Sequence, residues 1–191
     1  MIVIRALRAR TGGLSPVTLS RCQPSTSGLG IAEFCEAHTD DFVFIDGIPV
    51  LMVQTDNRKG DEKTVKSKYR KRGVPVHSAI RDGFVAWVRN LPRGPLFPKL
   101  KSYAGQRRTH ASHQVSKWLH DTVGIEKRKG HYWHRHCVST YLERAWVPDR
   151  LHDYLLGHTT KQAAAVYLHR DVKDLLAAIE TIPVPGAARG V

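Results

Sequence analysis

The stretch YWHRHCVSTYLERAWVPDRLHDYLLGHTTKQAAAVYLHR, Tyr132–Arg170, predicts two short helices joined by a turn. Apolar residues in its first half recur three or four positions apart, as on the buried face of a helix: Val138, Tyr141, Leu142 and Ala145. Pro148 suits the start of a second helix and Gly157 its end, because proline fits the first turn and glycine accepts the conformation that closes a helix. The same stretch carries an arginine among histidines, a Gly-His pair and a lone tyrosine, Tyr167.

Upstream of this stretch, FVFIDGIPVLMVQT predicts a β-hairpin. Two apolar runs flank Asp46-Gly47, a pair suited to the positive φ angles of a tight turn. Pro49 lacks a backbone N–H, so it predicts that the second strand begins at the edge of a sheet. The preceding GIAEFCEAHTDDF favours a short helix that closes near Thr39 or Asp40.

The remaining pattern is mainly helical. Val74-Pro75-Val76 reads as one more short strand, and helical spacing of apolar residues then predicts an amphipathic helix from Ile80 to Leu91 and a last one from Val172 to Ile179. We therefore expect an α+β fold, mainly α-helical, with a small antiparallel β-sheet. Residues 1–25 predict an irregular arm, residues 26–182 a single domain, and residues 183–191 a tail.

Composition indicates a polyanionic partner. The 191 residues include 30 Lys and Arg against 17 Asp and Glu, a formal net charge of +13, and nucleic acid is the commonest partner of such a chain. A merely basic surface is the alternative. Eight Lys and Arg fall among the fifteen residues 58–72. Three scattered cysteines predict no disulfide framework, and no long apolar run predicts a membrane span, so we expect a cytoplasmic protein.

Cleaving and rejoining DNA without a metal requires particular side chains. A nucleophile attacks phosphorus, cations neutralise the non-bridging oxygens, and an acid protonates the leaving 5′ oxygen. Tyrosine can be the nucleophile where positive charge stabilises its phenolate. Arginine suits the clamp because its planar fork binds two phosphate oxygens, and lysine or histidine suits the acid.

Several ordered motifs carry a resemblance to one family. Tyr167 lies nine residues after His158, which follows Leu-Leu-Gly, and Arg135-His136 precedes VSTYLERAWV. The stretches SGLGIAEFCEAHTDDFVFIDGIPVL, VKSKYRKRGVPVH and LFPKL add further matches. Over roughly residues 26–182 the chain resembles the catalytic domain of the tyrosine recombinases, the phage-integrase family.

The resemblance implies DNA integration or site-specific recombination through a covalent 3′-phosphotyrosyl intermediate. Tyr167 is then the nucleophile, Arg135 and His158 hold the scissile phosphate, and Lys66 protonates the leaving 5′ hydroxyl. It implies no metal and no other cofactor, and it implies double-stranded DNA as the partner of a self-associated tetramer. The residues expected to contact DNA are basic or imidazole side chains: Lys63, Lys68, Arg70, Lys71, Arg72 and His136.

Two positions depart from the family pattern. Gly30 stands where the family carries its first arginine, and Tyr132 stands where it carries the histidine three residues before Arg135. His131 lies one residue before the position at which the family carries its histidine. On a helix this difference of one residue would turn the side chain about 100° away from that position. The family's N-terminal DNA-clamping domain has no counterpart in residues 1–25. The alternative function is therefore a non-catalytic, DNA-binding remnant of an integrase.

A metal site is the rival interpretation of the histidines. His131, His134, His136 and Cys137 lie close together in the sequence. Zinc sites usually collect ligands from two separated segments, and the chain has no Cys-x-x-Cys or His-Glu-x-x-His pattern. We therefore expect no metal, and a role for Arg135 in helix packing alone is the remaining possibility.

Overall fold

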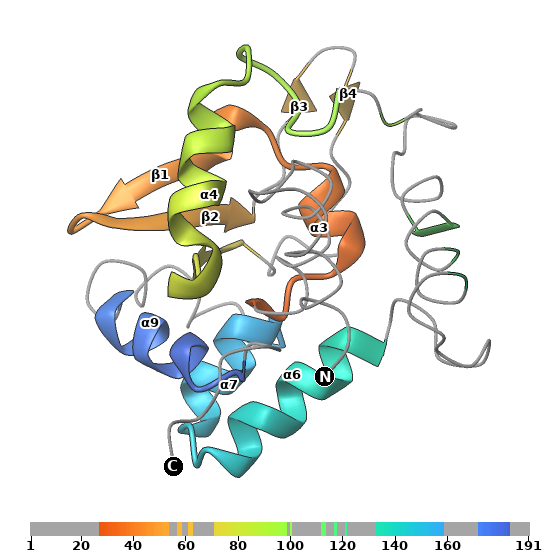
Figure 1. The fold of residues 1–191 in the computed structure, drawn as a ribbon. Coiled ribbons are helices and arrows are strands. Elements are labelled where there is room, and N and C mark those ends of the chain that lie inside the picture. Colours follow the sequence, from red (N-terminus) through yellow and green to blue (C-terminus); the bar gives the residue numbers. More distant parts are fainter. Residues whose placement is uncertain are drawn as a thin grey trace.

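The structure is a computed structural model of the 191-residue chain (Figure 1). It describes residues 27–53, 57–58, 61–62, 71–98, 100, 112–113, 117, 121, 133–158 and 172–183. The predicted arm, residues 1–25, lies outside the described residues, as does all but the first residue of the predicted tail. The described elements combine helices with a small antiparallel sheet, which agrees with the expected α+β class.

The sheet has three strands in the order β1-β2-β5. Strand β1 (Phe42–Ile45) and strand β2 (Ile48–Val53) form the predicted hairpin. Its turn residues Asp46 and Gly47 have φ angles of 50° and 77°, the signs that a two-residue hairpin turn of this kind requires. Strand β5 (Arg72–Pro75) pairs antiparallel with the other side of β2.

Pro49 corrects one prediction, because β2 is the central strand and not an edge strand. The Val76 amide donates to the Pro49 carbonyl at 2.9 Å. Pro49 has no N–H to donate in return, and the β2–β5 register ends at the neighbouring pair, Val50 with Pro75. The proline is accommodated because it lies at the point where the second ladder stops. A separate two-stranded ladder joins β3 (Asn57–Arg58) to β4 (Asp61–Glu62).

The helix before the hairpin is shorter than expected. Helix α3 (Ile31–Cys35) ends before Thr39, and a 3-10 turn, Thr39–Asp41, follows it. The reason is local, since the Asp41 carboxylate accepts a hydrogen bond of 2.7 Å from the His38 amide and so starts a new turn. Asp41 is buried, which fixes the entry into β1.

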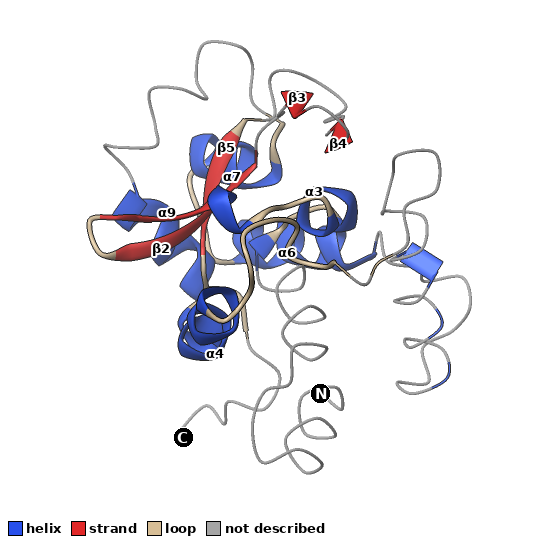
Figure 2. Ribbon diagram, turned by 90° about the horizontal axis from the view of Figure 1, so that it is seen from above, coloured by secondary structure: helices blue, strands red, loops and turns tan. Residues whose placement is uncertain are grey.

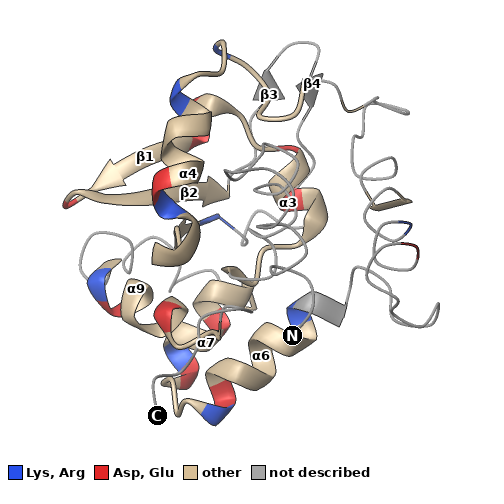
Figure 3. Ribbon diagram, viewed as in Figure 1, with Lys and Arg blue, Asp and Glu red and all other residues tan. Residues whose placement is uncertain are grey.

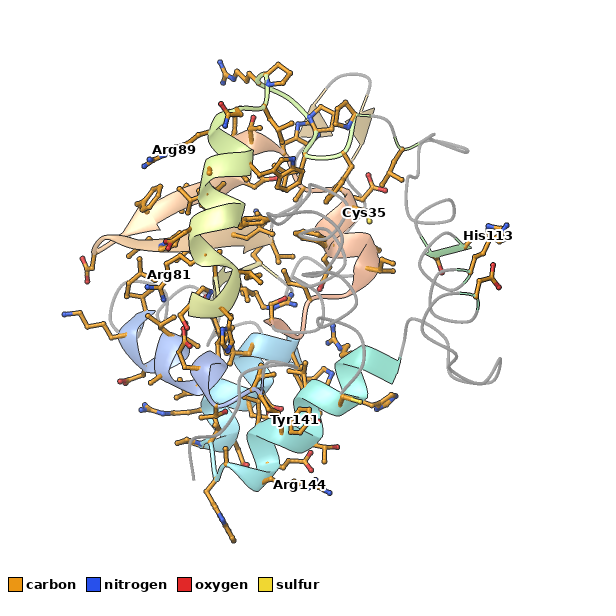
Figure 4. All side chains as sticks on the ribbon, viewed as in Figure 1. Cys35, Arg81, Arg89, His113, Tyr141 and Arg144 are labelled. Carbon is orange, nitrogen blue, oxygen red and sulfur yellow. The ribbon has the colours of Figure 1, made fainter. Side chains whose placement is uncertain are left out.

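Helix α4 (Ser78–Arg89) lies across β1 and β2 (Figure 1). The predicted apolar stripe is confirmed, with Ile80, Phe84 and Val88 buried. The Phe84 ring lies 5.6 Å from the ring of Phe42 on β1, so aromatic contact joins helix to sheet. On the outer side of α4, Arg89 extends over the half-exposed Phe44 ring (Figure 4).

Helix α7 (Asp149–Leu156) packs against both α6 (Trp133–Arg144) and α9 (Val172–Glu180) (Figures 1 and 2). Helices α7 and α9 both contact β5. The apolar stripe predicted for α9 is confirmed by the burial of Val172, Leu175 and Ile179. The stripe predicted for α6 is confirmed only in part, since Val138 and Leu142 are buried but Tyr141 and Ala145 are exposed. Tyr141 and Arg144 mark the opposite, exposed side of α6 (Figure 4).

Helix α9 packs on the core of its own chain. Glu180 at its end accepts hydrogen bonds from the Ser78 amide at 2.7 Å and the Ser78 hydroxyl at 2.6 Å, at the start of α4. Beside them, the buried His77 ring contacts the Ile182 carbonyl at 3.2 Å. Among the described helices, none combines the length and the apolar character that a membrane crossing requires.

Helices α6 and α7 end in the same hydrogen-bond pattern. After α6, Trp146 N donates to Glu143 O and Val147 N to Leu142 O, at 3.0 and 3.1 Å. The equivalent bonds after α7 run from Gly157 and His158, at 3.0 and 2.8 Å. This pattern places one residue in the left-handed region, where Gly157 has a φ of 67° and Trp146 one of 55°. The two ends therefore differ mainly in whether glycine fills that place.

The Trp146 position yields a stability prediction. Its side chain is 92% exposed, so it contributes little burial, while its backbone conformation is unfavourable for a residue with a Cβ. We expect Trp146→Gly to stabilise the protein by about 0.5–1 kcal/mol, the relief of the left-handed strain less the added entropy of the unfolded chain. Urea unfolding measures the change.

Trp146→Ala is the matched control for this prediction. It removes the same ring but keeps a Cβ at a φ of 55°, so its free energy of unfolding should stay within about 0.5 kcal/mol of the unmodified protein. Equal stabilisation by alanine and glycine would show that the exposed ring, and not the backbone, carries the cost.

Candidate functional site

The Glu33 carboxylate is the centre of a buried polar cluster. Arg72 on β5 grips it with both ends of its guanidinium, Nη1 to Oε1 at 3.0 Å and Nη2 to Oε2 at 2.9 Å. The amide of Gly30, just before α3, donates to the same Oε2 at 2.8 Å. The two side chains are 1% and 7% exposed, so this is an ion pair removed from water with its oxygens satisfied by hydrogen bonds.

Arg135 enters the cluster from the first part of α6. Its Nη1 lies 3.8 Å from Glu33 Oε2, and its Nη2 donates to the carbonyl of Leu156. The Arg135 side chain is 13% exposed, more than that of Arg72. Arg135 therefore lies on the solvent side of the same carboxylate.

Both arginines also bind the last turn of α7. Arg72 Nε donates to the Leu155 carbonyl at 3.0 Å, beside the bond that Arg135 makes to Leu156. The final carbonyls of a helix lack partners within the helix and carry partial negative charge, so guanidinium groups stabilise them. The cluster thus joins α3, β5, α6 and α7 at the point from which His158 emerges.

Electrostatics favour an ionised carboxylate within this cluster. Burial by itself raises the pKa of Glu33, but the charge and hydrogen bonds of Arg72, the Gly30 amide and the charge of Arg135 outweigh it and hold the pKa below 4.5. One carboxylate and two guanidinium groups sum to a single positive charge. His158 follows the end of α7 that both arginines contact, and its half-exposed side chain has Nδ1 3.9 Å from Asp153 Oδ1.

Three positions singled out by the sequence meet here. Gly30 precedes α3, Arg135 lies on α6 and His158 follows α7, and the first two approach each other across Glu33. His136 is exposed on α6, and Lys71 is exposed just before β5. The other predicted site residues lie outside the described residues: Lys63, Lys66, Lys68, Arg70, Tyr132 and Tyr167.

Arg72 requires a correction. We expected it to contact DNA because it ends a run of basic residues, but its side chain is buried and bound to Glu33 and to Leu155. The reason is that β5 begins at this residue and directs it inward against α7. Sequence reasoning also left Glu33 out of the site, although a glutamate three residues after a helix start is a known capping signal.

The positive charge is distributed unevenly along the chain. The described residues hold 11 of the 30 Lys and Arg but 14 of the 17 Asp and Glu, a net charge of −3, which leaves +16 in the rest of the sequence. Both signs of charge occur on each of α4, α6, α7 and α9 (Figure 3). A partner attracted by the net charge would therefore be attracted chiefly by the other segments, which include Lys63, Lys68 and Arg70.

The histidines form no metal site within the described part of the chain. No group of three or more His, Cys, Asp or Glu side chains there could hold an ion. His131 lies outside the described residues, so the zinc alternative in its full form is not tested.

Comparison with known proteins supports the resemblance. The chain is 29% identical over 147 residues, 75% of its length, to a protein named tyrosine recombinase from Thermosipho africanus (strain TCF52B). The matched part is 46% of that protein, so the chain spans less than half the length of this relative. No protein-family model matches the chain, and no solved structure matches it.

The buried pair yields a stability prediction. Glu33→Gln leaves Arg72 and Arg135 without their carboxylate, and removing one partner of a buried pair typically costs about 3–5 kcal/mol. Glu143→Gln on the surface of α6 is the matched control, since the Glu143 side chain is 64% exposed, and its cost should be below about 1 kcal/mol. Chemical unfolding at pH 7 measures both.

The same pair sets a pH dependence. Because the pKa of Glu33 is lower in the folded protein than its ordinary value of 4.5, its contribution to stability is complete above that value and is lost as pH falls through the lowered pKa. The unmodified protein should therefore lose free energy of unfolding more steeply below pH 4.5 than Glu33→Gln does. Parallel profiles for the two proteins would contradict the lowered pKa.

Proposed function

We propose that this chain binds the phosphate backbone of double-stranded DNA and acts in DNA integration or site-specific recombination through a covalent 3′-phosphotyrosyl intermediate. The observation that carries the proposal is the convergence of Arg135 and the His158-bearing end of α7 beside Gly30, across Glu33. The similarity to a tyrosine recombinase supports it.

In this proposal Arg135 and His158 hold the scissile phosphate. Arg135 belongs to a cluster with a net positive charge and lies on its solvent side, where a fork of N–H groups suits two phosphate oxygens. His158 is half exposed at the end of the helix that Arg135 contacts. A phosphate bound there completes the charge balance of the cluster.

The chemical step uses residues on the flanking segments. The Tyr167 hydroxyl releases its proton to solvent as its oxygen bonds to phosphorus, the bond from phosphorus to the 5′ oxygen breaks, and the Lys66 ammonium protonates that oxygen. The phosphotyrosine keeps the energy of the broken bond, so rejoining requires no nucleotide and no metal. We propose a tetramer on DNA as the working assembly, acting in the cytoplasm.

Gly30 limits this chemistry. The resemblance implies two arginines around the phosphate, and the position of the first holds a hydrogen atom in place of a guanidinium. Loss of one preorganised donor typically slows a reaction by about 10²–10³. We therefore propose that strand cleavage is slow. The glycine at this position is also what favours the second candidate, a DNA-binding remnant without cleavage.

The Gly30 site can accept the missing side chain. Its backbone angles, φ −67° and ψ 144°, are open to any residue. A Cβ there would lie 3.3 Å from Glu33 Oε2 and 3.8 Å from Arg135 Nη1, a close fit beside the cluster. An arginine at position 30 would thus begin next to Arg135, as the proposed phosphate site requires.

The proposed function predicts how DNA affinity depends on salt concentration. Binding to phosphates releases counterions, so the logarithm of the binding constant should fall steeply and linearly with the logarithm of salt concentration. Each lysine or arginine that neutralises a phosphate contributes about one to that slope, so replacing three such cations with glutamine should make the slope correspondingly shallower. The variant is Lys63→Gln, Lys68→Gln and Arg70→Gln combined.

A control of equal charge change comes from the described surface. It combines Arg93→Gln, Arg144→Gln and Arg150→Gln, three exposed residues in the part of the chain with a net charge of −3. Its slope should stay near that of the unmodified protein. A flat salt dependence of the unmodified protein would remove the DNA proposal.

The proposed function also predicts the effect of Gly30→Arg on strand cleavage. On a nicked duplex, Gly30→Arg should form more denaturation-resistant protein–DNA adduct than the unmodified protein, by about 10²-fold or more in single-turnover rate, because it restores a donor. Gly30→Ala fills the same close space without charge and is the control.

The nucleophile is tested in the same assay. Gly30→Arg with Tyr167→Phe should form no adduct and still bind DNA. Failure of Gly30→Arg to form any adduct, with DNA binding intact, would establish the remnant in place of the enzyme. An adduct that persists with Tyr167→Phe would assign the nucleophile elsewhere.

A further inference from the structure

Arg72 is the side chain in the cluster that the proposed chemistry leaves unused. From β5 it reaches α3 through both oxygens of Glu33, at 3.0 and 2.9 Å, and α7 through the carbonyl of Leu155, at 3.0 Å. Its neighbour Gly73 donates its amide to the buried Tyr154 hydroxyl of α7, also at 3.0 Å. The first two residues of β5 therefore hold α7 by two independent bonds.

We propose that Arg72 is a positioning residue, which sets the places of Arg135 and His158 and does not itself touch DNA. The inference rests on the function proposed above, since it concerns the two side chains that hold the phosphate there. Arg72 fixes Glu33, the carboxylate that Arg135 approaches at 3.8 Å, and it fixes the last turn of α7, from which His158 emerges.

Burial excludes Arg72 from the role of the missing clamp. Its side chain is 1% exposed, and its Nε, Nη1 and Nη2 each donate to a protein oxygen. A phosphate oxygen could reach this fork only by displacing Glu33, which would leave a buried carboxylate without its partner. Arg72 thus positions other residues, and it does not replace the arginine that the resemblance implies at position 30.

Gly157 shows how closely Arg72 is fitted to α7. A Cβ at Gly157 would lie 2.7 Å from Arg72 Nη1 and 3.0 Å from its Cζ, closer than real contacts allow. The equivalent place after α6 holds Trp146, which is exposed and has a similar φ. The backbone conformation alone therefore tolerates a side chain in this motif. At Gly157 the packing of the Arg72 guanidinium adds a second and stronger requirement for glycine.

The His158 amide reports on this placement. It donates to the Asp153 carbonyl at 2.8 Å, in the closing turn that Arg72 holds through Leu155. If Arg72 positions this turn, a variant that cannot grip Leu155 and Glu33 together should loosen the His158 bond more than bonds elsewhere in the core. A purely global effect on stability would loosen all core amides alike.

The test compares Arg72→Lys with Arg93→Lys by amide hydrogen exchange of the full chain. Both keep the charge and lose the fork, but the Arg93 side chain is 86% exposed. In Arg72→Lys, exchange at His158 should rise about tenfold relative to the Leu142 amide in α6, and the Arg135 Nε–H signal should shift. Arg93→Lys should change neither. Exchange at His158 that rises only in step with Leu142 would overturn the proposal.

A second variant keeps the test decisive if Arg72→Lys does not fold. Gly157→Ala pushes against the Arg72 guanidinium and should disturb the same two signals. Where Arg72→Lys does fold, its combination with Gly157→Ala should destabilise the protein by less than the sum of the single variants, because lysine has no Nη1. Strictly additive costs would overturn the fit described here. DNA binding by the unmodified protein tests the proposed function separately, so either idea can fail while the other stands.

Discussion

The buried pair of Glu33 and Arg72 is the interaction on which the rest of this structure depends. A carboxylate and a guanidinium lose their water when they are buried together, and they recover that free energy only when nearly every polar atom finds a partner. Here the partners come from different elements: the Gly30 amide before α3, the Leu155 carbonyl at the end of α7, and Arg135 of α6. The polar atoms of the pair are therefore all satisfied only when the sheet and these helices are in place together.

This constraint links stability to the proposed chemistry. Arg135 lies on the solvent side of a carboxylate that Arg72 has already bound through both oxygens. The second arginine shares the carboxylate at a longer distance, so Glu33, Arg72 and Arg135 together carry one positive charge, while the carboxylate of Asp153 lies 3.9 Å from the His158 ring. In the proposed function the anion bound there is a phosphate of the DNA backbone, whose two oxygens suit the fork of a guanidinium. The acidic surplus of the described residues indicates that attraction over longer distances comes from the rest of the sequence.

Gly30 borders the cluster at Glu33 and Gly157 borders it at Arg72, and the two have different physical reasons to be glycine. At Gly157 a left-handed backbone and the Arg72 guanidinium both oppose a side chain. At Gly30 the backbone is ordinary and a Cβ would meet only a tight contact with Glu33. The first glycine is thus required by the fold, whereas the fold permits other residues at position 30. Gly157 is thus a structural glycine, whereas Gly30 is, in the proposed function, the position of a phosphate-binding arginine that this chain lacks.

The sequence by itself determined the local structure and singled out two residues of the candidate site. Asp46-Gly47 predicted the hairpin turn, the spacing of apolar residues predicted α4, α6 and α9, and Gly157 predicted the end of α7, because each of these depends on neighbours within a few residues. The order of motifs also singled out Arg135 and His158. Only the tertiary structure decided the order of the strands and which polar side chains are buried. It placed β2 at the centre of the sheet despite Pro49, and it turned Arg72, the last of a run of basic residues, into the interior. Those outcomes depend on Glu33 and on the carbonyl of Leu155, which lie 39 and 83 residues from Arg72, and no local pattern records such distant partners.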